Sequence, residues 1–267
     1  MKLSEIYKLA DGLSSKSLSD EYCARYGAYD NSGILVDTGK DVTKILFALD
    51  LSLSAIKRAE EIGAELIFTH HPAIYGKIDC ISESELLGKK LIQCIEKGIS
   101  VLSMHLNLDC ADGGIDESLM QGIALASGTV LNGNEVKIMH PLFQGGYGRA
   151  YPIKERTASE LLDGIKREFS MPKAICYGGE KTVKKVASFC GAGADEESLR
   201  FAKENGADVI ISADFKHHLI AQALDDGLAV VVLTHYGSEN YGFKKYYEKI
   251  SREIKVSCEY HEESALI

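Results

Sequence analysis

The sequence predicts an α/β fold built from two α/β domains. From Lys44 onwards the chain repeats one unit, in which an apolar strand is followed by an amphipathic helix, a glycine and another apolar strand. This alternation is typical of βαβ units. Near Leu131 the pattern gives way to turn-rich sequence and then resumes. A length of 267 residues suffices for one large domain or two small ones, and the interruption favours two.

The first half contains two such repeats. A strand over residues 44–50 precedes a helix that ends at Gly63 and a strand over 65–69, and a second helix ends at Gly98 before a strand over 99–104. Each helix carries apolar residues three and four positions apart, so one of its faces can pack on a sheet. A glycine is expected directly after such a helix because it readily adopts the left-handed conformation that ends it.

The boundary between the domains is expected near residue 128. The sequence LNGNE and the glycine-dense segment GGYGR at 145–149 indicate turns. The predicted domains are residues 1–127 plus 236–267, and residues 128–235. In the second half we predict a helix over 157–169, strands near Ala174 and Val186, a helix to Asn205, a strand over 207–212, a helix to Asp226, a strand over 228–233, a last helix from about Glu239 with Ser238 as its N-terminal cap, and a strand over 255–259.

The composition indicates a globular protein of the cytoplasm. Hydrophobic residues make up 45% of the chain and charged residues 26%. The longest apolar run, residues 228–233, is too short to cross a bilayer, and the N-terminus lacks the features of a secretory signal. The seven cysteines are scattered without a Cys-x-x-Cys pair, as expected for reduced thiols. We therefore expect no membrane partner.

The charge balance disfavours nucleic acid as a partner. The formal net charge is −9 at pH 7. Affinity for phosphate backbones comes from clustered Lys and Arg side chains that release counterions. A locally basic surface is the alternative that the net charge leaves open.

Five side chains that suit a divalent metal follow the predicted strands. They are His70, His71, Asp109, His235 and Glu239. Open α/β sheets bind their ligands at the carboxyl ends of the strands, so these side chains are expected at such an edge. Imidazole and carboxylate together suit first-row divalent metals. A histidine pair can also be a structural feature, but several clustered segments favour a metal site.

Five donors are more than one ion needs, which predicts two divalent metal ions per chain. Two ions about 3.5–4 Å apart could share the donors, with Asp109 or Glu239 as the bridge. The donor types do not decide among zinc, iron, manganese, cobalt and nickel.

Three further histidines lie near the predicted strand ends. His105 follows the strand over 99–104, and His217 and His218 precede a predicted helix. Adjacent residues of a helix point in different directions, so only one of His217 and His218 can face a site. We assign proton transfer to His105 or His218 as a hypothesis.

Seven short motifs are distributed along nearly the whole chain. They are DNSGILV at 30–36, IFTHHPAIYG at 67–76, HLNLDCADGGID at 105–116, GGYGRA at 145–150, CGAGAD at 190–195, ADFKHHLIAQA at 213–223 and THYGSE at 234–239. With these motifs the chain resembles the GTP cyclohydrolase I type 2 homologs, also called NIF-three-like dinuclear metal centre proteins. The short spacing between the motifs is similar to that of members without an inserted domain.

The resemblance implies two α/β domains facing each other across a metal-containing cleft, with the five donors named above as the ligands. It also implies a homohexameric ring with its metal sites facing inward. The chain departs from the family pattern at Ala213 and Thr234, where glycine is usual. Both departures put the pocket shape, and hence any inherited substrate, in doubt, while every metal ligand is retained.

Two functions are compatible with such a centre. The first is a metal-dependent hydrolase of a nucleotide or related small molecule; for GTP, as the family name suggests, the purine imidazole ring would open with loss of formate. The residues available for its phosphates are Gly114, Arg149 and Lys216, although the Asp-Gly-Gly sequence before residue 115 also suits an ordinary turn. The alternative is a non-catalytic metal-binding ring with a regulatory or scaffold role.

Overall fold

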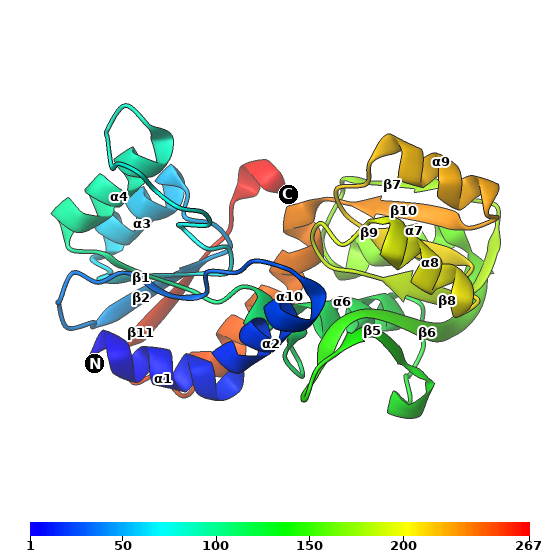
Figure 1. The fold of residues 1–267 in the computed structure, drawn as a ribbon, viewed down its shortest axis with the longest axis horizontal. Helices are drawn as coiled ribbons and strands as arrows, with labels where there is room; N and C mark the ends of the chain where they lie inside the picture. The colour runs from blue at the N-terminus through cyan, green and yellow to red at the C-terminus, as the bar shows by residue number, and fades with distance from the viewer. The chain divides into compact units, whose positions relative to one another are not determined.

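The computed structural model describes residues 1–267 as two compact units, each with its own sheet (Figure 1). Unit 1 comprises Met1–Ala111 and Phe243–Ser264, and unit 2 comprises Asp112–Gly242 and Ala265–Ile267. Ten α-helices and eleven strands confirm the predicted mixed α/β class. The contact-based limits lie at 111 and 242 rather than at the predicted 127 and 235, because the helix after residue 114 packs on elements of unit 2.

Unit 1 holds the N-terminal elements and the end of the chain. Its elements are α1 (Leu3–Leu13), α2 (Lys16–Tyr26), β1 (Gly33–Val36), β2 (Lys44–Ala48), α3 (Leu53–Ile62), β3 (Leu66–Thr69), α4 (Leu86–Lys97), β4 (Ser100–Ser103), α5 (Leu106–Cys110), the second half of α10 (His235–Ile250) and β11 (Ser257–His261). The sheet order is β1-β4-β3-β2-β11. All neighbours are parallel except β1, which runs antiparallel to β4.

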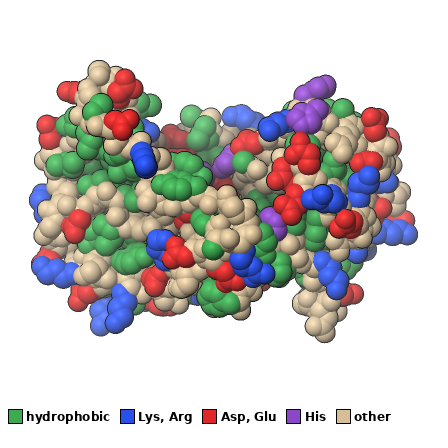
Figure 2. Space-filling view, in the orientation of Figure 1, with side chains coloured by type: hydrophobic (Ala, Val, Ile, Leu, Met, Phe, Trp, Pro, Cys, Tyr) green, Lys and Arg blue, Asp and Glu red, His purple; other side chains and the backbone are tan.

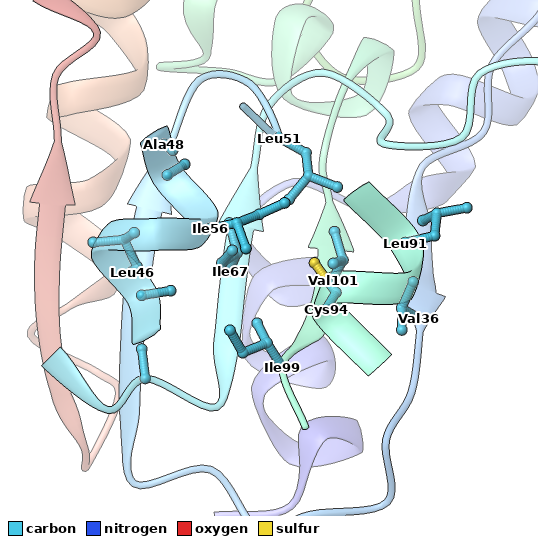
Figure 3. Packing of buried hydrophobic residues seen from close by; sticks show 13 residues of the cluster. Val36, Leu46, Ala48, Leu51, Ile56, Ile67, Leu91, Cys94, Ile99 and Val101 are labelled. Carbon is cyan, nitrogen blue, oxygen red and sulfur yellow. The ribbon is translucent and has the colours of Figure 1, made fainter. Parts of the chain in front are cut away.

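The sheet of unit 1 is buried on both faces, which explains the unbroken apolar runs of its strands. On one face Leu46, Ile67 and Val101 pack against α3 and α4 (Figure 3). On the other face Phe47 and Phe68 stack at 4.7 Å and contact Phe243 of α10. Gly63 and Gly98 end α3 and α4 in the left-handed conformation, as predicted.

Unit 2 holds the middle of the chain. Its elements are α6 (Ile115–Ala126), a 3₁₀ turn (Gly133–Glu135), β5 (Lys137–Pro141), β6 (Gly146–Thr157), α7 (Ala158–Glu168), β7 (Ala174–Tyr177), β8 (Thr182–Ser188), α8 (Glu196–Glu204), β9 (Val209–Ser212), α9 (His217–Asp225), β10 (Ala229–Leu233) and the start of α10; a second 3₁₀ turn covers Ser264–Leu266 at the chain end. The sheet order is β5-β6-β8-β9-β10-β7. Only β8, β9 and β10 are mutually parallel.

Helices cover both faces of the sheet in unit 2. Phe189, Ile210 and Val230 belong to the core under α8 and α9, while α6 and α7 pack on the opposite face against β6, β8 and β10. Figure 1 shows α8 and α9 in front of this sheet. The three parallel strands therefore end at one edge, as the predicted βαβ pattern requires.

Two local predictions were wrong, and one helix was missed. The GGYGR segment forms the start of the long strand β6 instead of a turn, and α2 was not anticipated. The last helix begins at His235, so Ser238 lies inside it rather than at its cap.

The surface carries charges of both signs. On the face drawn in Figure 2, acidic and basic side chains are interspersed and form no extended basic patch. No helix combines the length and apolar character that a membrane span needs.

Candidate metal centre

Unit 1 gathers polar side chains at the carboxyl edge of its sheet. The last paired residues of β2, β3 and β4 lie side by side in register. Asp50 lies two residues after the end of β2, His71 two residues after the end of β3, and His105 two residues after the end of β4. His70 lies between β3 and His71. The sheet register thus brings together side chains that are distant in the sequence.

Hydrogen bonds fix the rings of His70 and His71. The Nδ1 atom of the buried His70 lies 2.8 Å from the carbonyl oxygen of Met104, and that of His71 lies 2.7 Å from Oδ1 of Asp50. A carbonyl or carboxylate oxygen only accepts, so each Nδ1 donates. In a neutral imidazole this leaves Nε2 as the lone-pair nitrogen, which is the form that binds metals.

His105 is held in the same way by Asp30. Its Nδ1 atom donates to Oδ1 of Asp30 at 2.8 Å. The other oxygen of this carboxylate accepts from the hydroxyls of Ser19 at 2.5 Å and Ser32 at 2.7 Å. Burial alone would raise the pKa of Asp30, but the hydrogen bonds from His105, Ser19 and Ser32 outweigh it and hold the pKa well below its usual range. Asp30 is therefore a fixed carboxylate partner for His105.

The three imidazoles form one group of potential ligands. One ligand atom each of His70, His71 and His105 lies within 4.8 Å of the others, and the fixed Nδ1 atoms identify these atoms as Nε2. The Oδ1 atom of Asp109, in α5, lies 3.4 Å from Nε2 of His70. Neutral imidazoles with hydrogen-bonded Nδ1 atoms, next to a carboxylate, have the donor chemistry of a divalent metal site.

Unit 2 carries a second donor pair at the start of α10. Nε2 of His235 lies 3.2 Å from Oε2 of Glu239, one helical turn later. Nδ1 of His235 lies 2.6 Å from Oδ2 of Asp214, so this ring is oriented like the three in unit 1. Asp214 follows β9 and adopts a positive φ of 52°, a conformation that aspartate tolerates better than most residues.

The CGAGAD segment lies against this pair. The amide of Gly191 donates to Oγ of Ser238 at 3.0 Å, and that hydroxyl donates to the carbonyl of His235 at 2.8 Å. Gly191 has a φ of +55°, and a Cβ atom there would lie 2.2 Å from Oε1 of Glu239. Glycine at this position therefore allows the segment to approach a predicted ligand closely.

His217 and His218 do not belong to the groups of closely spaced donors. His217 and His218 are exposed at the start of α9. Nε2 of His218 lies 3.6 Å from Oε1 of Glu196 on α8. The proton-transfer roles of His105 and His218 stay predictions; the ring of His105 lies 5.3 Å from that of His70, between centroids.

The predicted phosphate contacts fall in different environments. Arg149 is only 2% exposed and forms an ion pair with the fully buried Asp116, so its guanidinium offers no accessible surface to a phosphate. Gly114 is the buried N-terminal cap residue of α6, and the preceding Gly113 amide donates to the carboxylate of Glu117 at 2.8 Å. Lys216 is exposed at the N-terminal cap of α9.

Three aspartates that were not predicted from the sequence hold rings of the candidate ligand histidines. Asp30, Asp50 and Asp214 orient His105, His71 and His235, respectively. A signal was present, because each aspartate lies beside a strand end or within one of the motifs quoted above. Metal-binding histidines usually donate their second nitrogen to such an acceptor.

The sequence and the fold are similar to those of known proteins. The model of the family Duf34/NIF3 (NGG1p interacting factor 3) matches residues 1–264. A "GTP cyclohydrolase 1 type 2 homolog" of Clostridium perfringens is 32% identical over 264 residues, covering 97% of this chain and 95% of that protein. A protein of the same description from Methanocaldococcus jannaschii is 32% identical over 259 residues, covering 96% and 97%.

Solved structures of similar fold include "Reduced HcgD from Methanocaldococcus jannaschii", with a TM-score of 0.78, 30% identity and coverage of 97% of each chain. A Bacillus cereus protein related to NIF3 has a TM-score of 0.81 at 18% identity, covering 97% of this chain and 96% of that one. The second likeness concerns the fold alone. The whole-chain match and the 32% identity show that this chain belongs to the Duf34/NIF3 family.

Proposed function

We propose that the chain binds two divalent metal ions through His70, His71, Asp109, His235 and Glu239. The observation that carries this proposal is the common arrangement of the histidines, in which Nδ1 donates to an acceptor and Nε2 is left as the lone-pair nitrogen. A histidine with a purely structural role needs a hydrogen-bond partner, but it does not need other imidazoles close to its second nitrogen. One ligand atom each of His70 and His71 lies within 4.8 Å of the other, and Oδ1 of Asp109 lies 3.4 Å from Nε2 of His70, a donor set that suits a divalent cation.

The activity that we propose for this centre is hydrolysis of a nucleotide or related small molecule. A divalent metal would lower the pKa of a water molecule toward ~7 and polarise the bond under attack. The chain itself would hold the ligands, and His105, fixed by Asp30, would accept or supply a proton at Nε2. A relative from Helicobacter pylori, 28% identical over 218 residues, is named "GTP cyclohydrolase 1 type 2", which supports nucleotides as the first substrates to test.

Contacts to the substrate are proposed at Lys216 and at the turn around Gly114. Lys216 is exposed, and a lysine provides a mobile positive charge for phosphate. The burial of Arg149 against Asp116 removes it from this set, because its charge is already compensated. His218 pairs with Glu196 and ranks behind His105 for proton transfer.

The metal content of untagged protein tests the centre. We expect close to two ions per chain in wild type, and clear loss in Asp109→Ala and Glu239→Ala, measured by elemental mass spectrometry. His218→Ala is the matched control, because it removes an exposed imidazole outside the donor groups. Metal-free wild type, or equal content in all variants, would refute the assignment.

Turnover then separates an enzyme from the non-catalytic alternative. Metal-loaded wild type is offered GTP, other nucleotides and phosphoesters across a range of pH. A hydrolase shows pH-dependent turnover that disappears in Glu239→Ala, whereas a regulatory or scaffold role gives metal binding without turnover.

We further propose that the protein acts in the cytoplasm as a homohexamer. The support is the resemblance of its motifs to the ring-forming family. Light scattering on the full chain is expected to give six chains per particle, and a monomer or dimer would contradict this.

A further inference from the structure

Two exposed tyrosines of unit 1 lie next to the histidine group. Tyr29 is 53% and Tyr75 is 52% exposed. Their ring centroids are 5.4 Å apart with an interplanar angle of 85°. The ring of Tyr75 also stands at 88° to that of His105, with a centroid separation of 6.1 Å. The pair therefore lies one side chain away from the candidate ligands.

The tyrosine pair is held in place by polar contacts. The hydroxyl of Tyr75 donates to the carbonyl of Tyr29 at 3.1 Å, and Nδ2 of Asn31 donates to the carbonyl of Ile74 at 2.6 Å. Between these two anchors lies Asp30, which fixes His105. One short segment thus orients both the aromatic pair and an imidazole of the site.

Core packing does not account for this arrangement. Single exposed apolar side chains are common on proteins, but here two such residues, each about half exposed, contact one another, and neither belongs to the buried core. Rings that are fixed before binding lose little entropy on contact with a ligand. Tyrosine rings also stack well on flat aromatic groups.

We propose that Tyr29 and Tyr75 form the aromatic wall of the substrate site, and that the substrate carries a planar aromatic ring. The inference rests on the proposed function, because the location of the pair matters only if the adjacent histidines bind metal. The ring would lie against the tyrosines while its reacting part reaches the imidazole group. The two tyrosines would then select among substrates of the metal centre.

Binding to metal-loaded protein tests the role of the pair. The probes are GTP and ATP, which carry an aromatic base, and inorganic triphosphate, which does not. We expect Tyr75→Leu to weaken both nucleotides about tenfold and leave triphosphate unchanged, in line with the contribution of one stacked base. Tyr75→Phe keeps the ring and should stay within about threefold of wild type, while Tyr177→Leu, an exposed tyrosine of β7 in unit 2, is the control.

The results of these binding and turnover measurements distinguish failure of the aromatic wall from failure of the proposed hydrolase activity. Metal content and circular dichroism of each variant establish that the centre and the fold are intact. Nucleotide binding that depends on Tyr75 without any turnover supports the aromatic wall and removes the hydrolase. Turnover with no preference for nucleotides over triphosphate, or equal weakening of all three probes, overturns the wall alone. A change in oligomeric state with unchanged nucleotide binding also overturns it and assigns the pair to a protein contact.

Discussion

The histidines of the candidate centre are prepared for metal by their neighbours. Asp50 accepts from Nδ1 of His71 and so keeps the lone pair on Nε2. We expect Asp50→Asn to weaken zinc binding by about 10- to 100-fold, because a neutral amide supports the imidazole less well than a carboxylate. Competition with a chromogenic chelator measures this affinity. Asp225→Asn, at the exposed end of α9, is the control for loss of one negative charge; equal effects of both variants would contradict the role of Asp50.

Gly191 is predicted to be irreplaceable for a steric reason. An alanine Cβ would lie 2.2 Å from Oε1 of Glu239, so Gly191→Ala should displace that carboxylate and remove most of the bound metal. The positive φ adds a cost of roughly 1 kcal/mol to folding. Gly206→Ala separates the two effects, because Gly206 has a φ of +63° with nothing within 4 Å of a Cβ. Elemental analysis should show normal metal in Gly206→Ala; metal loss in both would contradict the steric account.

Asp30 gives a pH dependence with a definite sign. Its folded-state pKa lies below the unfolded value, so its stabilisation is present above about pH 4 and is lost as the pH falls through the unfolded value toward the folded one. In metal-free protein with chelator, Asp30→Asn should lower the free energy of unfolding by about 1.5–3 kcal/mol at pH 7. Urea unfolding at pH 7, 5 and 3.5 should show the difference from wild type shrinking only at the lowest pH. A gap that is constant to pH 3.5 would contradict this.

The candidate ligands are recognisable at the level of residue types, and their role in metal binding stays a prediction. The His-His pair and the His-x-x-x-Glu spacing are local patterns; the first lies after β3, as expected, whereas His235 and Glu239 both lie inside α10, which begins four residues earlier than expected. The partners of the rings could not be predicted, because Asp30 and His105 are 75 residues apart and meet only through the fold. The burial of Arg149 was equally hidden, since it depends on the ion pair with Asp116.

At the scale of elements, the second half of α10 packs within unit 1 through aromatic side chains. Phe243 contacts Phe47 and Phe68 of the sheet, and Tyr246 lies 5.9 Å from Phe68 between ring centroids. Phe243→Ala should cost about 3–5 kcal/mol through lost burial and a cavity. The buried hydroxyl of Tyr246 has no hydrogen-bond partner in the protein, so Tyr246→Phe should change stability by less than about 1 kcal/mol. Urea unfolding compares them, and a large loss in Tyr246→Phe would reveal a partner for the hydroxyl.

The elements also show where sequence patterns stop being informative. The helices that end at Gly63 and Gly98 were predictable, because periodicity and the terminating glycine are both local. The strand β6 was not, because its glycines normally mark turns; a Cβ at Gly148 would lie 2.7 Å from Phe189, so the glycine serves packing between strands and core. The serine at 238 looked like a cap but instead links Gly191 to His235.

At the scale of the whole molecule, the proposed ligands are divided between the two units. Asp109 belongs to unit 1, and His235 and Glu239 belong to unit 2. A ligand that binds only the folded protein stabilises it by about 2.7 kcal/mol at 100 times its dissociation constant. Metal binding by the proposed donors is therefore expected to stabilise each unit that supplies them.

Hydrogen exchange can measure this stabilisation in each unit. On addition of zinc to metal-free protein, amide protection should rise after β3 and in α5 of unit 1 and also at the start of α10 in unit 2. In Glu239→Ala the rise at the start of α10 should become weaker, because one proposed ligand of unit 2 is lost. No rise at the start of α10 when zinc is added to wild type would contradict the assignment of His235 and Glu239 as ligands.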